Sequence, residues 1–188
     1  ATSLTTKKLS PKEVMTTLKK KYDDVIDDGG VYTVRKNGKW GFVSKDGKEL
    51  IAPTFTALGD EFVGGFIITF NGSKGIGFVS QKGKEIVKSK YSSARDFHNG
   101  FAAVCLNGKW GFVDKVGEEV ISLKYDHVDS FREGLAIVKL NGKYGYIDKT
   151  DKEVIPLKYD DTWPFREGLA KVELNGKWGL IDKIGKEV

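Results

Sequence analysis

Asn107-Gly108-Lys109-Trp110-Gly111 is a five-residue stretch that returns along the chain at a nearly fixed step. The same five residues occur at 37–41 and 175–179, and the copy at 141–145 differs only in carrying Tyr144 at the aromatic position. A degenerate copy at 71–77 carries Ile76 there. A fixed period of about 34 residues indicates a tandem repeat array. The sequence therefore predicts five copies of one small structural unit.

Each copy has the pattern of a hairpin followed by one or two short strands. In the copy at 122–155, the runs 135–140 and 144–147 are rich in β-branched and aromatic residues, and Asn-Gly-Lys joins them. Asn-Gly between such runs is a strong hairpin signal because both residues tolerate a positive φ. A second turn rich in Lys, Gly and Glu follows, as at 45–49 and 183–187. The predicted fold class is all-β.

The chain divides into a basic leader at 1–19 and five units that occupy 20–188. The predicted units are 20–52, 53–87, 88–121, 122–155 and 156–188. Ser10 and Glu13 form a capping-box pattern with Pro11 between them, so we expect a short helix over 11–21. A repeat array needs its exposed end covered, and this helix is suited to that role.

Two architectures fit an array of this length. An open, solenoid-like stack of three-stranded units accepts any number of copies and needs a cap. A five-bladed propeller closes on itself, although its usual blade is longer than these units. We expect the open stack, with the propeller as the alternative.

The distribution of charge argues against a nucleic-acid partner. The net charge is +5, and residues 1–21 account for all of it with six lysines and one glutamate. Because the remaining chain is neutral, we expect no basic face for nucleic acid on the repeats. Contact with a membrane is expected only through the basic leader, since no stretch approaches the ~20 apolar residues of a spanning helix.

The residues at 107–115, 120–125 and 131–136 resemble the WG-repeat family, also called KWG repeats. The resemblance covers residues 20–188. It implies a bacterial protein, with a periplasmic, cell-surface or secreted location, and it carries over no catalytic residue. The second unit departs from the pattern: Ile76 replaces the Trp, Phe55 replaces a Tyr, and two extra residues lie around Ser73.

Two sets of aromatic residues recur and are the main candidates for the core or for a ligand. They are Trp40, Trp110, Tyr144 and Trp178 after the hairpin turn, and Tyr22, Tyr91, Tyr125 and Tyr159 at the opening of units. We expect an aromatic ladder in which each unit buries its ring against the next; the alternative is a row of platforms for sugars. Trp163 breaks the pattern, so we predict it as the first binding residue, followed by Ile76 and Ser73 of the divergent unit.

Catalytic, metal and cofactor sites are not indicated. His98 and His127 lie in different units without a partner at metal-ligand spacing, and Cys105 lies in an apolar run typical of a buried thiol. The aspartates Asp114, Asp148 and Asp182 recur before the second turn, where we expect them to accept hydrogen bonds from turn amides. We expect no cofactor and no enzyme activity.

The expected function is a non-catalytic protein-interaction or scaffolding module in a bacterial envelope or extracellular assembly. A protein is the expected partner. A glycan is the alternative partner, bound by exposed aromatic rings. The third hypothesis, an enzyme, would need an asymmetric cleft with perturbed acids, most plausibly around the second unit. The edges of an open array also leave strands available for pairing with another chain.

Overall fold

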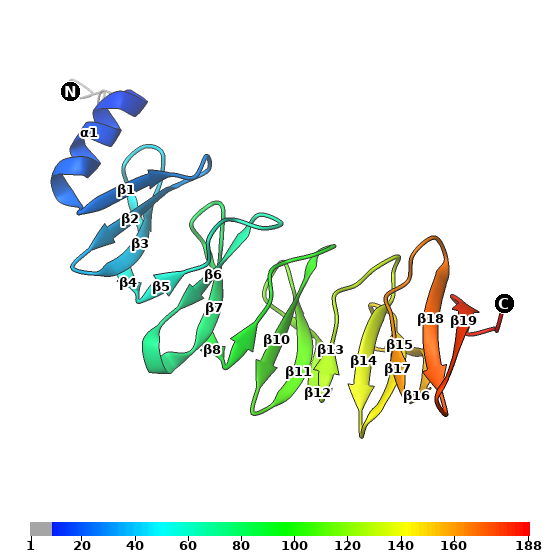
Figure 1. Ribbon diagram of the computed structural model, residues 1–188. Helices are drawn as coiled ribbons and strands as arrows, with labels where there is room; N and C mark the ends of the chain where they lie inside the picture. Colours follow the sequence, from blue (N-terminus) through cyan, green and yellow to red (C-terminus); the bar gives the residue numbers. More distant parts are fainter. Residues whose placement is uncertain (1–8) are drawn as a thin grey trace, which may run out of the picture. The chain divides into compact units, whose positions relative to one another are not determined.

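The computed structural model describes residues 9–188, which fold into one α-helix, one short 3-10 helix and five small antiparallel sheets (Figure 1). The helix α1 spans Pro11–Lys21, and the 3-10 helix η1 spans Gly72–Lys74. The first sheet contains β1 (Asp24–Asp27), β2 (Tyr32–Lys36), β3 (Lys39–Val43) and β4 (Glu49–Phe55). The second contains β5 (Ala57–Leu58), β6 (Phe66–Phe70), β7 (Ile76–Ser80) and β8 (Glu85–Tyr91).

The other three sheets repeat this order of strands. The third contains β9 (Ser93–Ala94), β10 (Phe101–Leu106), β11 (Lys109–Asp114) and β12 (Glu119–Tyr125). The fourth contains β13 (His127–Val128), β14 (Ala136–Leu140), β15 (Lys143–Ile147) and β16 (Glu153–Tyr159). The last has three strands, β17 (Asp161–Thr162), β18 (Leu169–Leu174) and β19 (Lys177–Asp182).

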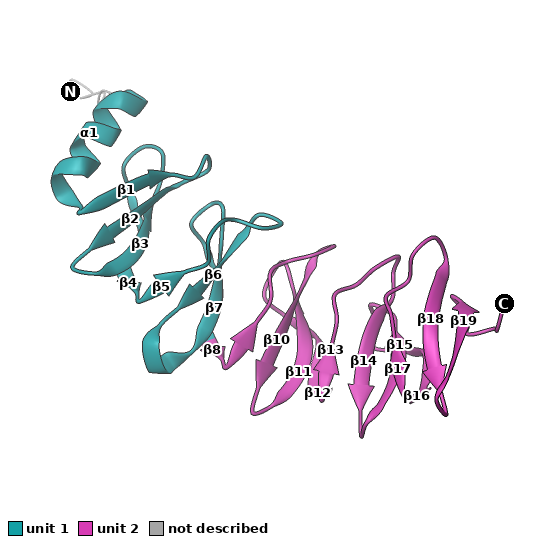
Figure 2. Ribbon diagram, viewed as in Figure 1, with its two compact units in different colours: residues 1–89 teal, residues 90–188 magenta. Residues whose placement is uncertain are grey.

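The chain forms two compact units, residues 1–89 and 90–188 (Figure 2). The first unit holds the helix and two sheets, and the second holds three sheets. Within each unit the sheets follow one another in chain order, and no sheet closes into a barrel. The predicted all-β tandem array with a short N-terminal helix is confirmed. Residues 1–8 of the predicted basic leader lie outside the described residues.

The helix begins and packs as its sequence indicates. The Ser10 hydroxyl accepts from the Glu13 amide, and the Glu13 carboxylate accepts from the Ser10 amide at 2.8 Å, which completes the predicted capping box. Val14 and Leu18 are buried against Tyr32 and neighbouring residues of the first sheet. The helix therefore covers the outer face of that sheet.

The Asn-Gly turns explain the spacing of each hairpin. Asn107 and Gly108 have φ angles of 52° and 77°, and the three other intact copies have the same two positive values. Two consecutive positive φ angles match the right-handed twist of paired strands. Position 71–75 differs, because the extra residues form η1 in place of a two-residue turn.

The glycine after Trp40, Trp110 and Tyr144 has a different role, which is close approach of the backbone. In the third sheet, Trp110 pairs with Tyr125 and Phe112 pairs with Ile121, so a bulge in β12 lies opposite Gly111. A Cβ at Gly111 would lie 2.3 Å from the Ile121 carbonyl oxygen. The position therefore accepts only glycine without a backbone shift.

Within each compact unit, the core lies between consecutive sheets. Its central rings stand two residues after the aromatic position at which we predicted the ladder. Phe42, Phe78, Phe112 and Tyr146 are each 1% exposed or less. Within the second unit, the Phe112 and Tyr146 rings contact Phe131 and Phe165 of the next copy, with ring centroids 4.9 Å apart in both pairs. Burying such a ring stabilises the fold by roughly 2–3 kcal/mol. The stacked aromatic rings that we expected at the residue directly after the turn are therefore found two residues later.

The post-turn aromatics lie instead at the rim of each sheet, where they are half-buried or exposed. Trp40 lies opposite Phe55, the last residue of β4, with the Arg35 guanidinium carbon 5.6 Å from its ring centroid. Trp110 and Tyr144 are likewise paired with cations at 4.7 and 4.6 Å, whereas Trp178 is 45% exposed. Neighbouring side chains leave part of each of these rings uncovered, and a cation lies over that part of the ring.

The Tyr set is buried, and it closes each sheet at the point where we placed the opening of a unit. Tyr22, Tyr91, Tyr125 and Tyr159 are all 5% exposed or less. Tyr125 and Tyr159 end β12 and β16, and each pairs with the aromatic residue after its own hairpin turn. The sheets thus begin two residues after Tyr22, Phe55, Tyr91, Tyr125 and Tyr159, at 24, 57, 93, 127 and 161.

Candidate binding surface

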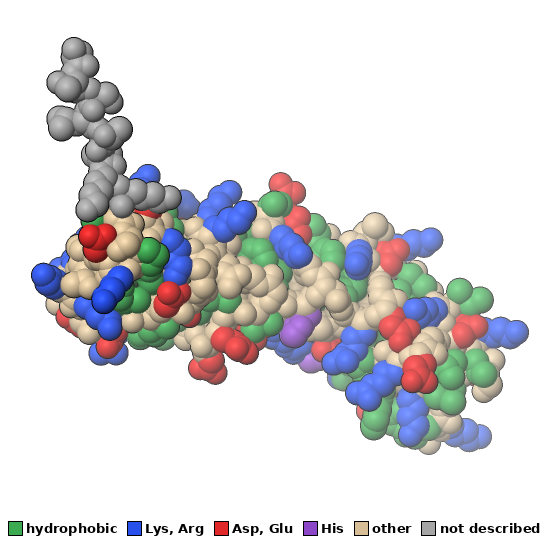
Figure 3. All heavy atoms as spheres, turned by 90° about the horizontal axis from the view of Figure 1, so that it is seen from above, with side chains coloured by type: hydrophobic (Ala, Val, Ile, Leu, Met, Phe, Trp, Pro, Cys, Tyr) green, Lys and Arg blue, Asp and Glu red, His purple; other side chains and the backbone are tan. Residues whose placement is uncertain are grey.

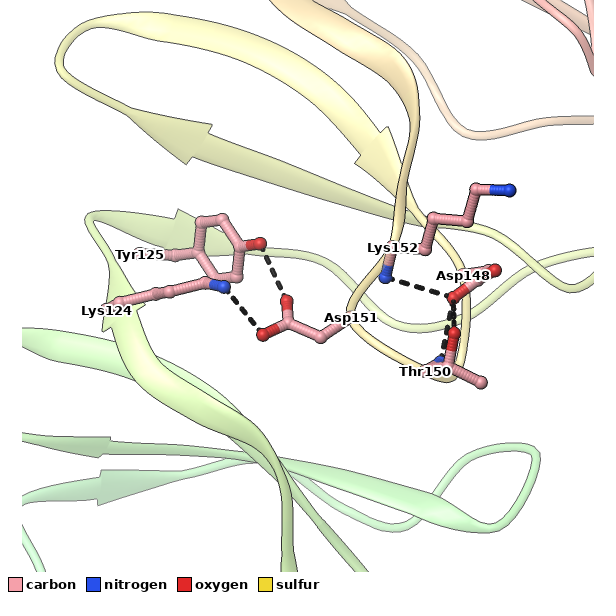
Figure 4. Close-up of polar contacts among 6 residues, drawn as sticks. All are labelled: Lys124, Tyr125, Asp148, Thr150, Asp151 and Lys152. Atoms are coloured by element: carbon pink, nitrogen blue, oxygen red, sulfur yellow. Dashed lines mark hydrogen bonds and ion pairs between the residues drawn. The ribbon is translucent and has the colours of Figure 1, made fainter.

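A Lys-Tyr-Asp triplet lies at the end of the fourth strand in the third and fourth sheets, where the chain passes to the next sheet. In the triplet that begins at Lys124, both leading side chains point toward Asp151 (Figure 4). Tyr125 Oη donates to Asp151 Oδ1 at 2.8 Å, and Lys124 Nζ donates to Asp151 Oδ2 at 2.6 Å. Because Asp151 lies in the turn between β15 and β16, one carboxylate joins the third and fourth sheets.

The same contact recurs with a glutamate at two other positions. Tyr91 Oη and Lys90 Nζ both donate to Glu119 Oε1, at 2.7 and 2.8 Å. The bond from Lys90, and to a smaller extent the bond from Tyr91, lower the pKa of Glu119. Burial raises the pKa of Tyr91 above its ordinary range. Tyr22 donates to Glu49 at 2.6 Å in the same way.

The aspartate of the triplet joins two hairpins. Asp126 Oδ1 accepts from Lys109 Nζ at 2.5 Å, and Asp126 Oδ2 accepts from the Asn141 amide at 2.8 Å. Asp160 makes the equivalent pair of bonds with Lys143 and the Asn175 amide. Both bonds lower the pKa of each aspartate, and the bond from the lysine has the larger effect. These repeated charges therefore have structural partners.

The aspartates before the second turn accept from turn amides, as predicted. Asp148 Oδ1 accepts from the amides of Thr150 and Lys152 at 2.8 and 3.1 Å (Figure 4). Asp114 and Asp182 hold their own turns by the same two bonds. Their carboxylates are thus committed to the turns.

Within residues 9–188, the last sheet differs from the other four in having no seven-residue strand beside β19. Only Glu187 and Val188 lie along that edge, through the pairing of Glu187 with Ile181 and a bond from the Val188 amide to the Leu180 carbonyl at 3.1 Å. A Cβ added at Gly179 would meet no heavy atom within 4 Å. The close approach that requires glycine at Gly111 is therefore missing at Gly179.

The outer face of the last sheet is also open. Lys171 pairs with Leu180 at the position where Ile137 pairs with Tyr146 and Ala103 pairs with Phe112. Those earlier residues are buried between sheets, whereas Lys171 is exposed and Leu180 is 44% exposed. Leu169 and Trp178 are exposed as well. The last sheet thus presents apolar side chains around a lysine.

Sequence reasoning identified Trp178 but missed Leu180 and Lys171. A signal for both was available in the alignment of the copies. Leu180 stands where the other copies have Phe or Tyr, and Lys171 stands where they have an uncharged residue.

Trp163, the first predicted binding residue, belongs to the same sheet and is 58% exposed. Its amide donates to the Lys171 carbonyl, and Lys171 Nζ lies 5.4 Å from the Trp163 ring centroid and 5.5 Å from that of Trp178. The structure therefore brings Trp163 and Trp178 together around one cation. We name the set Trp163, Leu169, Lys171, Trp178 and Leu180 the terminal face.

A groove of about 400 Å³ lies along the open edge of β19. Its walls include Tyr159, Val172, Lys177, Trp178, Gly179 and Glu187. The groove and the terminal face share Trp178, so one ring belongs to both surfaces.

The two other predicted binding residues lie in the first unit. Ile76 is half-buried at the start of β7, where it pairs with Phe70, and Ser73 is exposed within η1. Nearby in that unit, a hollow of about 310 Å³ is lined by Trp40, Asp28 and Asp60 among others. Asp28 is already bonded to the Thr33 hydroxyl. Ile76 and Ser73 do not line this hollow.

Other chemistry is limited within residues 9–188. No three His, Cys, Asp or Glu side chains there come together as a metal site, and no helix there has the length and apolar character to cross a membrane. Cys105 is a buried free thiol. Lys, Arg, Asp and Glu side chains are interspersed on the face that Figure 3 shows.

Comparison with solved structures finds matches at low sequence identity. Hsv2 of Kluyveromyces lactis matches with 13% identity and a TM-score of 0.46, over 86% of this chain and 60% of that one. The computationally designed Ika8 protein matches with 11% identity and a TM-score of 0.44, over 87% and 59%. The chain thus spans about three-fifths of the length of these proteins. No curated protein matches the chain.

The family comparison agrees with the repeat geometry. The family described as WG containing repeat matches residues 40–74, 76–110, 110–144 and 144–178. Three matches start at the aromatic residue after a hairpin turn, and the other starts at Ile76, which takes that place in the second sheet; together they cover most of the chain. The chain belongs to the WG-repeat family.

Proposed function

We propose that this chain is a non-catalytic protein-interaction module that acts as a scaffold through its terminal face. The observation that carries the proposal is the concentration of exposed apolar side chains on one sheet. Ten large hydrophobic side chains are exposed in residues 9–188, and six of them are Trp163, Leu169, Trp178, Leu180, Ile184 and Val188. Exposed apolar groups gathered in this way are typical of interaction sites.

The chemistry of the terminal face suits a protein partner. Tryptophan provides much of the binding energy in protein interfaces because its large, stiff ring loses little entropy on burial. Lys171 and Glu173 supply polar groups of both signs beside Trp163 and Trp178. The other repeated charges are bonded within the array, which leaves the last sheet as the preferred surface.

We place this module in a bacterial envelope or extracellular assembly. The support is the resemblance of its repeats to WG-repeat chains of that setting. Fractionation of the source cell with an antibody to the chain would test this, and recovery only with cytoplasmic markers would contradict it.

Affinity capture with paired baits tests the interaction itself. The baits are the full chain, a Trp163→Ala/Leu180→Ser variant and a matched control, Val116→Ala, which alters an exposed apolar residue away from the terminal face. We expect a partner to be retained by the full chain and the control and lost by the double variant. The partner is then purified and its Kd measured with all three. Equal affinity for all three would contradict the proposal.

A carbohydrate-binding module is the second candidate, favoured by the two exposed rings that flank Lys171. Such rings can stack on sugar faces. Titration with soluble glycans, followed by tryptophan fluorescence, tests this alternative. Saturable quenching that Trp163→Ala abolishes would support glycan binding, and an unchanged spectrum would leave the protein-interaction proposal in place.

A further inference from the structure

The hollow of about 310 Å³ in the first unit lies between the first and second sheets. Ile26, Thr33 and Trp40 line it from the first sheet, and Leu58 and Ile67 line it from the second. Its volume is at the lower end of the range of about 300–1,000 Å³ that is usual for ligand pockets. A hollow of this size suits one long side chain.

Two carboxylates that line the hollow have no cation beside them. Asp28 accepts from the Thr33 hydroxyl, and Asp60 is exposed just after β5. Within residues 9–188 neither of them forms an ion pair, whereas Asp27 pairs with Lys45. A cation that entered the hollow would therefore meet two carboxylates that are free to pair with it.

A buried hydroxyl beside the hollow also lacks a partner. Thr69 lies opposite Leu58 and two residues from Ile67, so its side chain is on the same face of the second sheet as theirs. The Thr69 side chain is fully buried, and its Oγ1 has no hydrogen-bond partner in the described part of the chain. The other four sheets have valine at this position, opposite the repeat glycine. A donor placed between Leu58 and Ile67 would supply the missing partner.

An arginine occupies the equivalent place between the third and fourth sheets. Arg95 has the position in the third sheet that Ile26 has in the first, four residues after the tyrosine that precedes the sheet. Its guanidinium carbon lies 4.7 Å from the Trp110 ring centroid, and its Nη1 donates to the Val128 carbonyl at 2.6 Å. A guanidinium thus joins the two sheets there.

The counterparts of these residues all line the hollow. Trp40 corresponds to Trp110, since each precedes the repeat glycine. Leu58 corresponds to Val128, since each is the third residue after the aromatic that ends a fourth strand. Because Ile26 is shorter than arginine and uncharged, the first unit has the surroundings of the guanidinium without the guanidinium itself.

Arg35 does not take this role. Its guanidinium carbon lies 5.6 Å from the Trp40 ring centroid, but Arg35 is not among the residues that line the hollow. Its Nε lies 3.4 Å from Asp24 Oδ2, which gives it an ion-pair partner of its own. The hollow therefore remains available to a cation from another molecule.

We propose that this hollow binds an arginine side chain of a partner polypeptide. The guanidinium lies against the Trp40 ring and accepts no proton, but donates charge-assisted hydrogen bonds to Asp28 and Asp60. The methylene groups of the arginine pack between Ile26 and Leu58. Arginine is preferred to lysine because its planar group both stacks on an aromatic ring and bonds two carboxylates at once. This site is separate from the terminal face.

The test is a titration of a chain of residues 1–188 with the peptide acetyl-Gly-Arg-Gly-amide, followed by heteronuclear NMR. We expect saturable shifts of the Trp40 indole N–H and of the Leu58 and Gly59 amides. The Trp110 indole N–H should not shift, because Arg95 already occupies its place. A citrulline peptide, which keeps the shape without the charge, should not bind, and a lysine peptide should bind more weakly.

Three variants separate the parts of the proposal. Asp60→Asn should weaken peptide binding by about threefold or more. The matched control Glu61→Gln removes the same charge one residue away, outside the hollow, and should leave binding unchanged. Both positions are exposed, so circular dichroism should show an unaltered fold. Ile26→Arg should abolish binding, because its own guanidinium would fill the hollow as Arg95 fills the equivalent place.

Several results would overturn the proposal. They are the absence of a saturable shift at Trp40, equal binding of the citrulline or lysine peptide, and equal binding by Asp60→Asn or Ile26→Arg. Tighter binding of free methylguanidine than of the arginine peptide would identify a small molecule as the ligand and also overturn it. A dimer in sedimentation that Asp60→Asn abolishes, without peptide binding, would identify a second copy as the occupant and overturn it too.

These outcomes are distinct from those of the proposed function. If the peptide does not bind but a partner is still lost by Trp163→Ala/Leu180→Ser, the inference on the hollow fails and the interaction function stands. If the peptide binds and no partner depends on the terminal face, the inference on the hollow stands and the terminal-face proposal fails.

Discussion

The first and last sheets have the same hairpin but meet their surroundings differently. The first sheet has its outer residues Tyr32, Val34 and Val43 buried beneath α1. The last sheet leaves Leu180 and Trp178 exposed and has no complete fourth strand. In a repeat array each unit buries its apolar face only against a neighbour. The comparison teaches that, within residues 9–188, the outer face of a sheet is buried where another element covers it and exposed where none does.

Substitution of the repeat glycine gives the largest expected contrast. Gly111→Val places side-chain atoms against the Ile121 carbonyl and should lower the free energy of unfolding by at least about 3 kcal/mol. Gly179→Val should change it by no more than about 0.5 kcal/mol, as for an exposed site. Urea unfolding followed by circular dichroism measures both. Equal losses would show that the edge of β19 is covered.

Substitution of a leucine by alanine should have the next largest effect, and it should destabilise the covered outer face of the first sheet more than the outer face of the last sheet. Leu18 is 3% exposed beneath the helix, so Leu18→Ala should cost about 2–3 kcal/mol of unfolding free energy. Leu180→Ala should cost about 0.5 kcal/mol or less. The same urea titration serves as the measurement. A large effect at Leu180 would contradict an open terminal face.

Removal of a tyrosine hydroxyl should have a smaller effect. Tyr125→Phe breaks the bond to Asp151 and should cost about 1 kcal/mol. Tyr159→Phe should be nearly neutral, since its hydroxyl has no protein acceptor among residues 9–188. Thermal unfolding of the two variants beside the full chain checks the difference. A greater loss for Tyr159→Phe than for Tyr125→Phe would be inconsistent with the structure.

Acid should weaken the joined sheets gradually. The folded-state pKa values of Glu119, Asp126 and Asp160 are lowered, so these groups release protons more readily when folded. Their stabilisation is present above the ordinary pKa values, near pH 4, and is lost as pH falls through the lowered values. Unfolding free energy should therefore decrease from about pH 5 downward. Asp126→Asn should flatten that slope, and an unchanged slope would exclude its contribution.

The repeat period and hairpin turns allowed much of the fold to be predicted. Asn107-Gly108 specified the turn, and the Ser10 and Glu13 pair specified the start of the helix, because both signals act between residues close in sequence. The identity of the core ring was harder to predict. Trp110 and Phe112 point to the same region in a simple strand, and only the bulge opposite Gly111 separates the rim from the core.

The candidate site was predictable only in part. Trp163 stood out because its position holds no aromatic in the other copies, and the structure leaves its side chain exposed. Its proximity to Trp178 and Lys171 depends on the pairing of β17, β18 and β19. The sequence pattern alone did not predict the register of that pairing. The groove depends on the absence of a neighbouring strand and therefore required the structure.

Amide hydrogen exchange resolved by residue tests the central claim, that the edge of β19 is open, most directly. In the fourth sheet, the amides of Tyr144 and Tyr146 face β16 and should exchange slowly. The equivalent amides of Trp178 and Leu180 should exchange at least a hundredfold faster in a chain of residues 1–188. Equal protection of the two pairs would contradict the account, because β19 would then already have a partner strand.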